Sequence, residues 1–265
     1  MEITAEEKKV GDELLAILSD PHADVSYDKI PESMGGKILN ADIARELSPS
    51  YRSVIERTLY TRATYDAAKN YVFDRFMRDL KKTKGVVIIL AGGAASGKTT
   101  SIKTILAFAD LVFDSNCADL VKGKLLIDAA VKQGWFVLVV YIHRNFKVAV
   151  ESMLKRAVST GRAIPLRCVT GSNLATLHHN AQQTFVELDR IYADNKRVKL
   201  IALRNPWTPD SSTNPTTISV KTLAKGGKRH YSAIEELYVI QEEVVQRFLD
   251  SSQISQELKR EIGYA

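Results

Sequence analysis

The sequence predicts an α/β fold in which a mostly parallel β-sheet is flanked by helices on both faces. In residues 85–205, short apolar runs alternate with helical patterns, which is the order that builds a parallel sheet. The run "GVVIILA", residues 85–91, is too short for a helix and rich in branched side chains, as a strand buried on both faces is. A glycine-rich loop follows this run, and a helical pattern follows the loop.

Three further apolar runs predict the other strands of this central region. The runs are "LVFDS" (residues 111–115), "GWFVLVVYIH" (residues 134–143) and "RVKLIALRN" (residues 197–205). The intervening segments have helical character. We expect helices from Lys98 to about Ala109 and over residues 118–132, 146–159 and 175–193.

The flanking regions are predicted to be mostly helical. Thr4 and Glu7 form a capping-box pattern, as do Ser232 and Glu235 near the other end. The chain therefore divides into a helical N-terminal region, a central α/β core that contains the glycine-rich loop, and a C-terminal loop and helical tail that we expect to pack back on the sheet. These three parts are residues 1–84, residues 85–205 and residues 206–265. The N-terminal region is expected to pack on the core and is a candidate contributor to the active site.

The composition is that of an ordinary globular protein and limits the classes of function. Of 265 residues, 45% are apolar and 26% are charged. Two cysteines make no disulfide framework, so we expect a reduced, cytoplasmic protein. The longest apolar runs are too short to span a bilayer, and no membrane partner is expected. The net charge of +6 suits anionic partners of several kinds.

The segment "LAGGAASGKTT", residues 90–100, has the spacing of a phosphate-binding loop, the P-loop of nucleotide-binding proteins. Small residues let the backbone N–H groups point at an anion, and the following helix N-terminus adds to the attraction. We expect ATP here, with Lys98 at its β and γ phosphates and the Thr99 hydroxyl on Mg²⁺, rather than a turn without ligand. The residues expected to hold the nucleotide are Gly92, Gly93, Ala94, Ala95, Ser96, Gly97, Lys98, Thr99 and Thr100.

Two aspartates follow apolar runs and are candidate partners of this loop. Asp114 closes a predicted strand, where a magnesium-side carboxylate of the Walker B kind lies; the competing interpretation is a turn or helix-cap aspartate. Asp42, in "ILNADIAREL", stands before a helical pattern and could equally be a cap. Nothing in its spacing brings Asp42 to the P-loop.

The segment from His143 to Arg167 is strongly basic and predicts an arginine-bearing lid. Arg156 falls on the last turns of its helix, and Arg162 follows on a glycine-flanked turn. Arginines so placed can neutralise charge on a transferring phosphate. The competing interpretations are a solvated helix face and a nucleic-acid groove, and aromatic side chains for stacking bases are sparse here. We expect the neighbouring His178 and His179 to lie at the surface or at a substrate rim.

With these motifs, the segment from Val86 to Asn205 resembles the zeta-toxin-like P-loop kinases. The matching stretches are "AGGAASGKTT", "FDSN", "GWFVLVVYIHR", "LKRAVSTGRAIP" and "VKLIALRN", of which the "R…GR.IP" lid is the most family-specific. The resemblance implies phosphorylation of a nucleotide-linked acceptor such as UDP-N-acetylglucosamine. It also implies a product that poisons cells, and a small antitoxin protein as a partner.

A second resemblance lies before the P-loop. "LNADIARELSP", residues 39–49, is similar to the family's N-A-D-x-I-A-x-x-L-S-P segment, whose aspartate deprotonates the substrate hydroxyl. In most members this segment follows the P-loop. Either the sheet is rearranged so that residues 37–50 lie beside the loop, which makes Asp42 the base and leaves Asp114 for magnesium or substrate, or the match is chance and Asp114 serves both roles.

Together these features favour an ATP-dependent kinase. Its γ-phosphoryl group would pass to a hydroxyl of a small molecule, with Asp42 or Asp114 as the base and Arg156 and Arg162 stabilising the transferring group. One alternative is an NTPase or kinase that acts on nucleic acid through the basic segment. Another is a non-catalytic, ATP-gated interaction module that docks through its helical ends. The acceptor itself cannot be read from the sequence.

Overall fold

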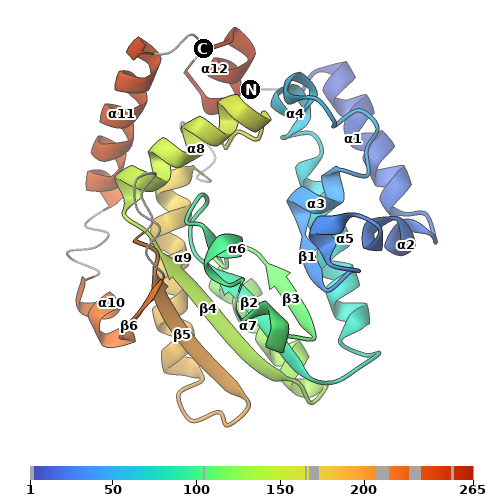
Figure 1. Ribbon diagram of the computed structural model, residues 1–265, viewed down its shortest axis with the longest axis vertical. Coiled ribbons are helices and arrows are strands. Elements are labelled where there is room, and N and C mark those ends of the chain that lie inside the picture. Colours follow the sequence, from blue (N-terminus) through green and yellow to red (C-terminus); the bar gives the residue numbers. More distant parts are fainter. Residues whose placement is uncertain are drawn as a thin grey trace.

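The computed structural model describes residues 3–103, 105–164, 166, 173–206, 215–226, 234–251 and 254–264. They contain a six-stranded sheet in the order β1-β3-β2-β4-β5-β6 (Figure 1). The pairings among β1 to β5 are parallel, and β6 is antiparallel to β5, so the predicted mostly parallel α/β sheet is confirmed. The strands are β1 (Ile38–Asn40), β2 (Val86–Ala91), β3 (Leu111–Asp114), β4 (Phe136–His143), β5 (Val198–Arg204) and β6 (Thr216–Ile218).

The central strand β2 is apolar throughout because both of its faces are buried. Val87 and Ile89 belong to the core on one face of the sheet, and Ile88 and Leu90 to the core on the other. A strand covered on both sides has no reason to alternate apolar with polar residues. The apolar run ends at Ala91, where the backbone leaves the sheet to form the P-loop.

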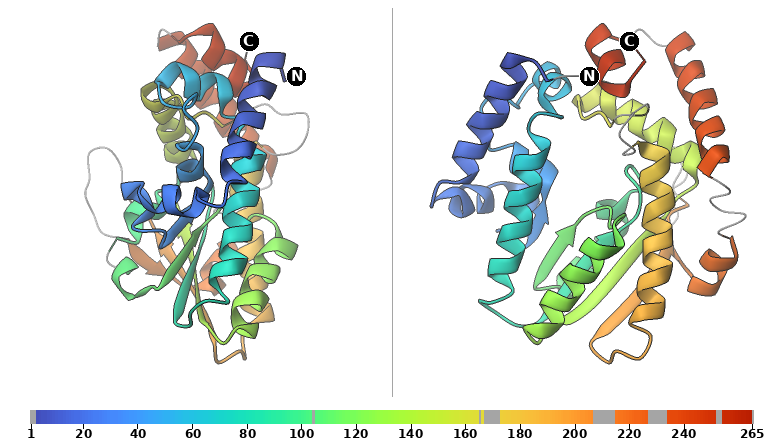
Figure 2. Two further views of the ribbon diagram at one scale, coloured as in Figure 1. Left: turned by 90° about the vertical axis from the view of Figure 1, so that its right-hand side faces the viewer. Right: turned by 180° about the vertical axis from the view of Figure 1, so that it is seen from behind.

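Three helices cover one face of the sheet (Figure 2). Phe76 meets Phe113 of β3 with ring centroids 4.9 Å apart, and Phe185 stacks on Tyr141 of β4 at 5.0 Å. These aromatic pairs anchor the helices over the middle of the sheet. The helices are α5 (Tyr65–Asp79), α7 (Leu120–Lys132) and α9 (Leu174–Ile191).

The other face is covered by the segment that follows the P-loop, and here the predicted helix to Ala109 is wrong. The α-helix α6 spans only Lys98–Ser101, and a 3₁₀ turn, η2, spans Leu106–Phe108. Ile102 and Leu106 are buried against the sheet. A segment rich in β-branched residues favours this close packing over further helical turns.

The N-terminal region contributes the edge strand β1, which lies parallel to β3 with Asn40 opposite Asp114. The Tyr27 hydroxyl fixes this strand, accepting the Asn40 N–H at 2.9 Å and donating to the Ile38 carbonyl at 2.8 Å. The predicted capping box of Thr4 and Glu7 is confirmed. The other elements of this region are α1 (Ala5–Leu18), α2 (Ala23–Asp28), η1 (Pro31–Ser33), α3 (Ala41–Arg45) and α4 (Val54–Tyr60).

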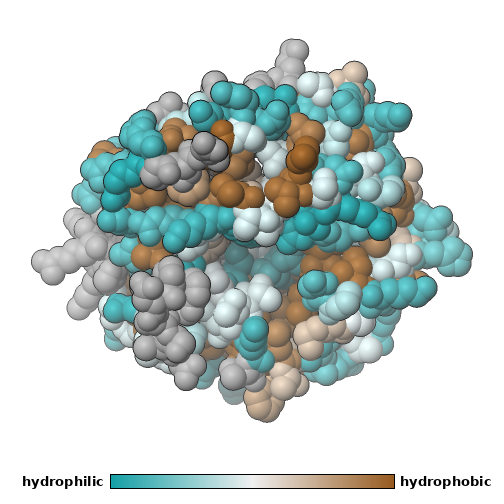
Figure 3. Space-filling view, turned by 45° about the horizontal axis from the view of Figure 1, so that its top comes forward, coloured by the Kyte–Doolittle hydropathy of each residue, from teal (hydrophilic) through white to brown (hydrophobic). Residues whose placement is uncertain are grey.

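Of the C-terminal elements, α11 and α12 pack on other helices, whereas β6 pairs with β5 and Leu223 of α10 is buried in the core on one face of the sheet. Val245 of α11 and Leu154 of α8 belong to a second core, separate from the one between α9 and the sheet. The capping residue Ser232 lies outside the described residues. With the top of the molecule tilted toward the viewer, hydrophilic side chains separate several hydrophobic patches on the surface (Figure 3). The elements are α8 (Phe146–Thr160), α10 (Val220–Gly226), α11 (Ile234–Ser251) and α12 (Gln256–Ile262).

Replacing Leu39 in β1 should test how firmly the edge strand is held. Its side chain is fully buried in the core, so Leu39→Ala is expected to lower the free energy of unfolding by about 2–5 kcal/mol. Ile55→Ala is the control, because Ile55 is 70% exposed and its loss should change stability by less than about 0.5 kcal/mol. Urea unfolding measures both. Equal effects of the two substitutions would contradict the burial of β1.

Candidate active site

The P-loop curls because three of its residues adopt left-handed backbone conformations. Gly92 has φ 129°, Ala95 has φ 55° and Gly97 has φ 80°. At Gly92 there is no room for a side chain, since a Cβ would lie 2.7 Å from the Ile142 carbonyl oxygen. The glycines of the motif are therefore required by close backbone approach as well as by φ.

Three successive carbonyls of the P-loop are held by side chains from three different parts of the chain. His178 Nε2 lies 2.8 Å from the Ala94 oxygen, Arg144 Nη1 donates to the Ala95 oxygen at 2.7 Å, and Asn205 Nδ2 donates to the Ser96 oxygen at 2.8 Å. In a trans peptide the N–H points away from the carbonyl. Fixing the Ala94 and Ser96 carbonyls outward therefore turns the N–H groups of Ala95 and Gly97 toward the inside of the loop, where an anion binds, whereas the Ser96 N–H donates to the Gly93 carbonyl at 3.3 Å.

His178 is a buried support of the P-loop, so the expectation of a surface or rim position is wrong for it. It is fully buried, and burial lowers its pKa to about 3, so the ring is neutral and can donate from Nε2 to the Ala94 carbonyl. Gly93 makes room for it, since a Cβ there would lie 2.1 Å from the ring. The rings of Phe146 and His178 meet in a T-shaped arrangement with their centroids 5.2 Å apart.

The Lys98 ammonium lies within the P-loop. Its Nζ is 3.4 Å from the carbonyl oxygens of Gly92 and Gly93 and 3.2 Å from Asn116 Oδ1. Burial is the main cause that lowers its pKa, opposed by Asp114. These partners hold the positive charge at the position from which a P-loop lysine reaches phosphates.

The ends of the parallel strands β1 and β3 bring two carboxylate-bearing segments together. Asn40 Nδ2 donates to Asp114 Oδ2 at 2.7 Å, and Thr99 Oγ1 donates to the same oxygen at 3.2 Å. A hydroxyl and a carboxylate are oxygen ligands of the kind Mg²⁺ takes, with phosphates and waters completing the shell. Within the described ranges no group of three or more His, Cys, Asp or Glu side chains could hold a metal alone.

Asp42 lies at the same end of the sheet, so the arrangement with residues 37–50 beside the P-loop is the one observed. Its N–H donates to Asn40 Oδ1 at 2.6 Å, and Asn40 is thus the helix cap of α3. Arg45 Nη1 donates to Asp42 Oδ1 at 2.9 Å and Arg156 Nη2 to Oδ2 at 2.5 Å. Burial would raise the pKa of Asp42, but the charges of Arg45, Arg156 and Arg162 outweigh it and hold the pKa at about 2.

The basic lid segment meets the N-terminal region at α3 and α4. Arg162 pairs with Glu46, whose other oxygen accepts from Arg57 Nη2 at 2.7 Å. Gly161, with φ 75°, ends α8, and a Cβ there would lie 2.1 Å from the Val54 carbonyl oxygen. The lid turn is thus packed against α4 with no space for a larger residue.

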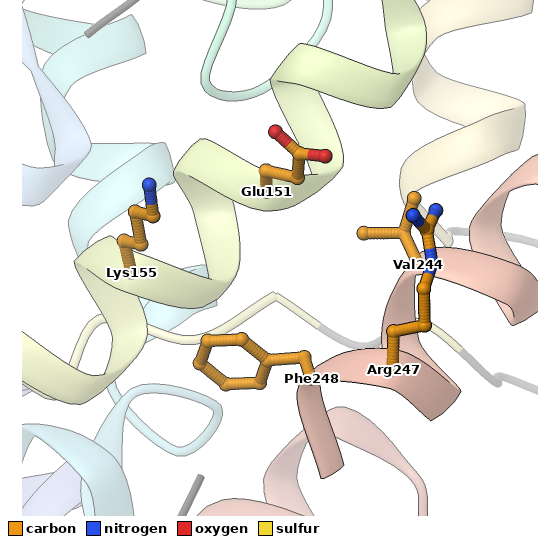
Figure 4. A pocket seen from close by; sticks show the side chains of 5 residues that line it. All are labelled: Glu151, Lys155, Val244, Arg247 and Phe248. Atoms are coloured by element: carbon orange, nitrogen blue, oxygen red, sulfur yellow. The ribbon is translucent and has the colours of Figure 1, made fainter. Parts of the chain in front are cut away.

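Lys155, next to Arg156 in sequence, belongs to a different surface. It lines a groove of about 180 Å³ between α8 and α11, together with Glu151, Val244, Arg247 and Phe248 (Figure 4). Neighbouring residues on a helix face different directions. Among the described basic residues of this segment, Arg156 pairs with Asp42 of α3, and Arg162 pairs with Glu46, which caps the C-terminal end of that helix.

Several residues of the site were not selected by their sequence patterns. Asn40, Arg45 and Glu46 lie within the segment "LNADIARELSP", where a local signal existed. Arg144 lies in the basic segment, but its role as a P-loop support had no sequence signature. Asn116, His178 and Asn205 reach the P-loop only because β3, α9 and β5 lie beside it.

Comparison with known proteins relates part of the chain to one protein family. The profile of the zeta toxin family matches residues 107–210. This part of the chain is zeta-toxin-like. The match is to the predicted family, over a span that covers less than half of the chain and begins after the P-loop. A search of curated proteins finds no match.

Two solved structures are similar at low sequence identity. The crystal structure of the AvrRxo1-ORF1:-ORF2 complex has a TM-score of 0.46 and 11% identity, covering 68% of this chain and 84% of that one. The PezAT chromosomal toxin–antitoxin system of Streptococcus pneumoniae has a TM-score of 0.41 and 13% identity, covering 94% of this chain and 99% of that one.

In the part of the chain that the structure describes, no helix is long and apolar enough to cross a membrane.

Replacing His178 with glutamine should show how much stability the protein loses at acid pH because the buried imidazole stays neutral. The folded protein keeps His178 unprotonated down to about pH 3, whereas the unfolded chain gains a proton near pH 6.5. The free energy of unfolding therefore falls as the pH drops below 6.5. His178→Gln keeps a donor for the Ala94 carbonyl but does not titrate. The stability of the protein relative to His178→Gln should be constant above neutral pH and decline from there toward acid.

Chemical denaturation at a series of pH values from about 8 to 4.5 measures that difference. The values above neutral pH serve as the internal reference. A difference that stays constant over the whole series would contradict a buried, neutral His178.

Proposed function

We propose that the protein is an ATP-dependent kinase that transfers the γ-phosphoryl group of ATP to a hydroxyl of a small molecule. The observation that carries the proposal is the ion pair of Asp42 with Arg156, 2.5 Å long, at the strand ends next to the P-loop. A carboxylate suited to an acceptor hydroxyl and an arginine suited to a phosphoryl group thus meet beside a nucleotide-binding loop.

On the donor side, the N–H groups of the P-loop would bind the phosphates and Lys98 would neutralise them. Thr99 and Asp114 would hold Mg²⁺, which supplies neutralisation of phosphate charge when it is bound. Asn116 positions Lys98 through a contact of 3.2 Å, and Asn40 positions Asp114 through one of 2.7 Å. These contacts support a preformed donor site that needs little rearrangement.

On the acceptor side, Asp42 would orient the hydroxyl. The oxygen of the acceptor hydroxyl bonds to the γ-phosphorus while the bond from that phosphorus to the β–γ bridging oxygen breaks. ADP leaves with the bridging oxygen. The hydroxyl proton passes to the Asp42 carboxylate and from there to water. With a pKa of about 2, Asp42 is a weak base, so its main contribution would be orientation before a late proton transfer.

Arg156 and Arg162 would stabilise the charge of the transferring group. Arg156 is 37% exposed and Arg162 27% exposed, and both side chains come from the lid segment. An arginine fork matches the oxygens of a phosphoryl group. Turning from the α3 carboxylates to the phosphoryl group would bring donor and acceptor halves together.

The finer identity of the acceptor follows from the resemblance alone. We propose a nucleotide sugar or nucleotide cofactor as its class. Because the matched family is named for a toxin, we further propose that the product is toxic in the cytoplasm and that an antitoxin protein restrains the enzyme.

Lys98→Ala should abolish phosphoryl transfer, because the loop would lose its phosphate-binding charge. Radiolabelled ATP and a metabolite extract provide the assay, and mass spectrometry identifies the product. Lys103→Ala is the matched control, since Lys103 is exposed beyond α6. Full activity of Lys98→Ala would refute the kinase proposal, and label on oligonucleotides, lost at high salt, would favour the nucleic-acid alternative.

Asp42→Asn should separate donor binding from transfer. The amide keeps the size of the side chain but cannot take the hydroxyl proton, so the transfer rate is expected to fall by about 10²- to 10⁴-fold. ATP affinity, measured by calorimetry, should stay within about threefold. Asp74→Asn, on the exposed side of α5, should leave both quantities unchanged. A fully active Asp42→Asn would remove Asp42 from the reaction.

A further inference from the structure

The two carboxylate oxygens of Asp42 are held by two different arginines. Arg45 Nη1 donates to Oδ1 at 2.9 Å, from one turn further along α3. Arg156 Nη2 donates to Oδ2 at 2.5 Å, from α8. An acceptor hydroxyl that is to bind this carboxylate must therefore share or replace one of these partners.

The two arginines differ in how firmly they are held. The Arg45 side chain is only 5% exposed, and its guanidinium carbon lies 5.9 Å from the Tyr51 ring centroid and 5.2 Å from that of Tyr65. Tyr51 is fully buried and bonded to Thr61 at 2.7 Å. Two aromatic rings thus fix Arg45 in place, whereas Arg156 is 37% exposed and lies on the lid helix.

On the basis of the proposed function, we propose that Arg45 is a positioning residue that stays bound to Asp42 throughout the reaction, whereas Arg156 binds Asp42 only until the substrates arrive. Arg45 holds the Asp42 carboxylate through Oδ1 during the whole cycle. Arg156 leaves Oδ2 for the phosphoryl group, and the acceptor hydroxyl takes its place at Oδ2. The lid arginine thereby couples the arrival of the donor to the release of the base.

Electrostatics gives this division of roles a measurable consequence. When Arg156 moves away, Asp42 loses one of the charges that keep it ionised, and Arg45 remains on the same helix. A neighbouring opposite charge lowers a carboxyl pKa by about 1–3 pH units. The groups that face Asp42 are Arg45 from α3, Arg156 and Arg162 from the lid segment, Lys98 from the P-loop, Tyr65 from α5, and Asp114 of β3 through Asn40.

The first comparison that tests the proposal uses three variants of the full chain: Arg45→Met, Arg156→Met and Arg78→Met. Arg78 is the matched control because it also pairs with an aspartate, Asp24, but on the exposed side of α5. Carboxyl NMR titration follows the pKa of Asp42 directly, and the pH dependence of the transfer rate follows its effect. Arg45→Met should raise both the pKa and the acid limb of kcat by about 1–3 pH units, with KM for ATP within about twofold.

Arg156→Met should raise the Asp42 pKa by less than Arg45→Met does. It should lower kcat, but it should shift the acid limb of the pH profile less than Arg45→Met does. Arg45→Lys, which keeps the charge, should restore most of the original profile. If Arg45→Met fails to fold, Tyr65→Leu removes the more exposed ring of the pair and should shift the profile in the same direction by a smaller amount.

The proposal is overturned if Arg45→Met titrates and reacts like Arg78→Met, or if Arg156→Met shifts the Asp42 pKa more than Arg45→Met. The titration separates this outcome from a failure of the kinase proposal. A parent protein that transfers no phosphate refutes the proposed function, whereas the titration still decides whether Arg45 is the dominant partner of Asp42.

Discussion

The side chain of Asn40 makes the contacts on which the arrangement of the site depends. Its oxygen accepts the N–H of Asp42 at 2.6 Å, and its nitrogen donates to Asp114 at 2.7 Å. One amide therefore caps the helix that carries Asp42 and orients the Asp114 carboxylate beside Thr99. This is possible because β1 lies parallel to β3 with residues 40 and 114 in register. Carboxyl ends of parallel strands meet at one edge of a sheet, and binding sites form there.

From this edge, two sets of supports extend in opposite directions. His178, Arg144 and Asn205 hold the P-loop from the side of β4, β5 and α9, while the arginine–carboxylate pairs join the lid to α3 and α4. Ion pairs of partly buried groups contribute little net stability because desolvation offsets their attraction. Their value here is geometric, since they set which oxygen of each carboxylate faces which cation.

Much of the core and of the P-loop region could be predicted from local patterns. The strand before Gly92, the spacing to Lys98 and the aspartate closing β3 are each encoded within a few residues. The helix predicted after Lys98 was too long because burial of Ile102 and Leu106 against the sheet competes with helical periodicity. Support of the P-loop by His178 could not be predicted, since a histidine on a helix has the same local pattern whether it faces solvent or a loop.

The sequence by itself determined the α/β class, the P-loop and the candidate lid, because hydrophobic periodicity and glycine spacing are local properties of the chain. Only the tertiary structure decided that a segment placed before the P-loop in sequence supplies an edge strand beside it, and that Asp42 therefore meets Arg156. The physical reason is that strand pairing joins residues far apart in the chain. The order of strands in a sheet follows from burial of the whole core, not from any one of its segments.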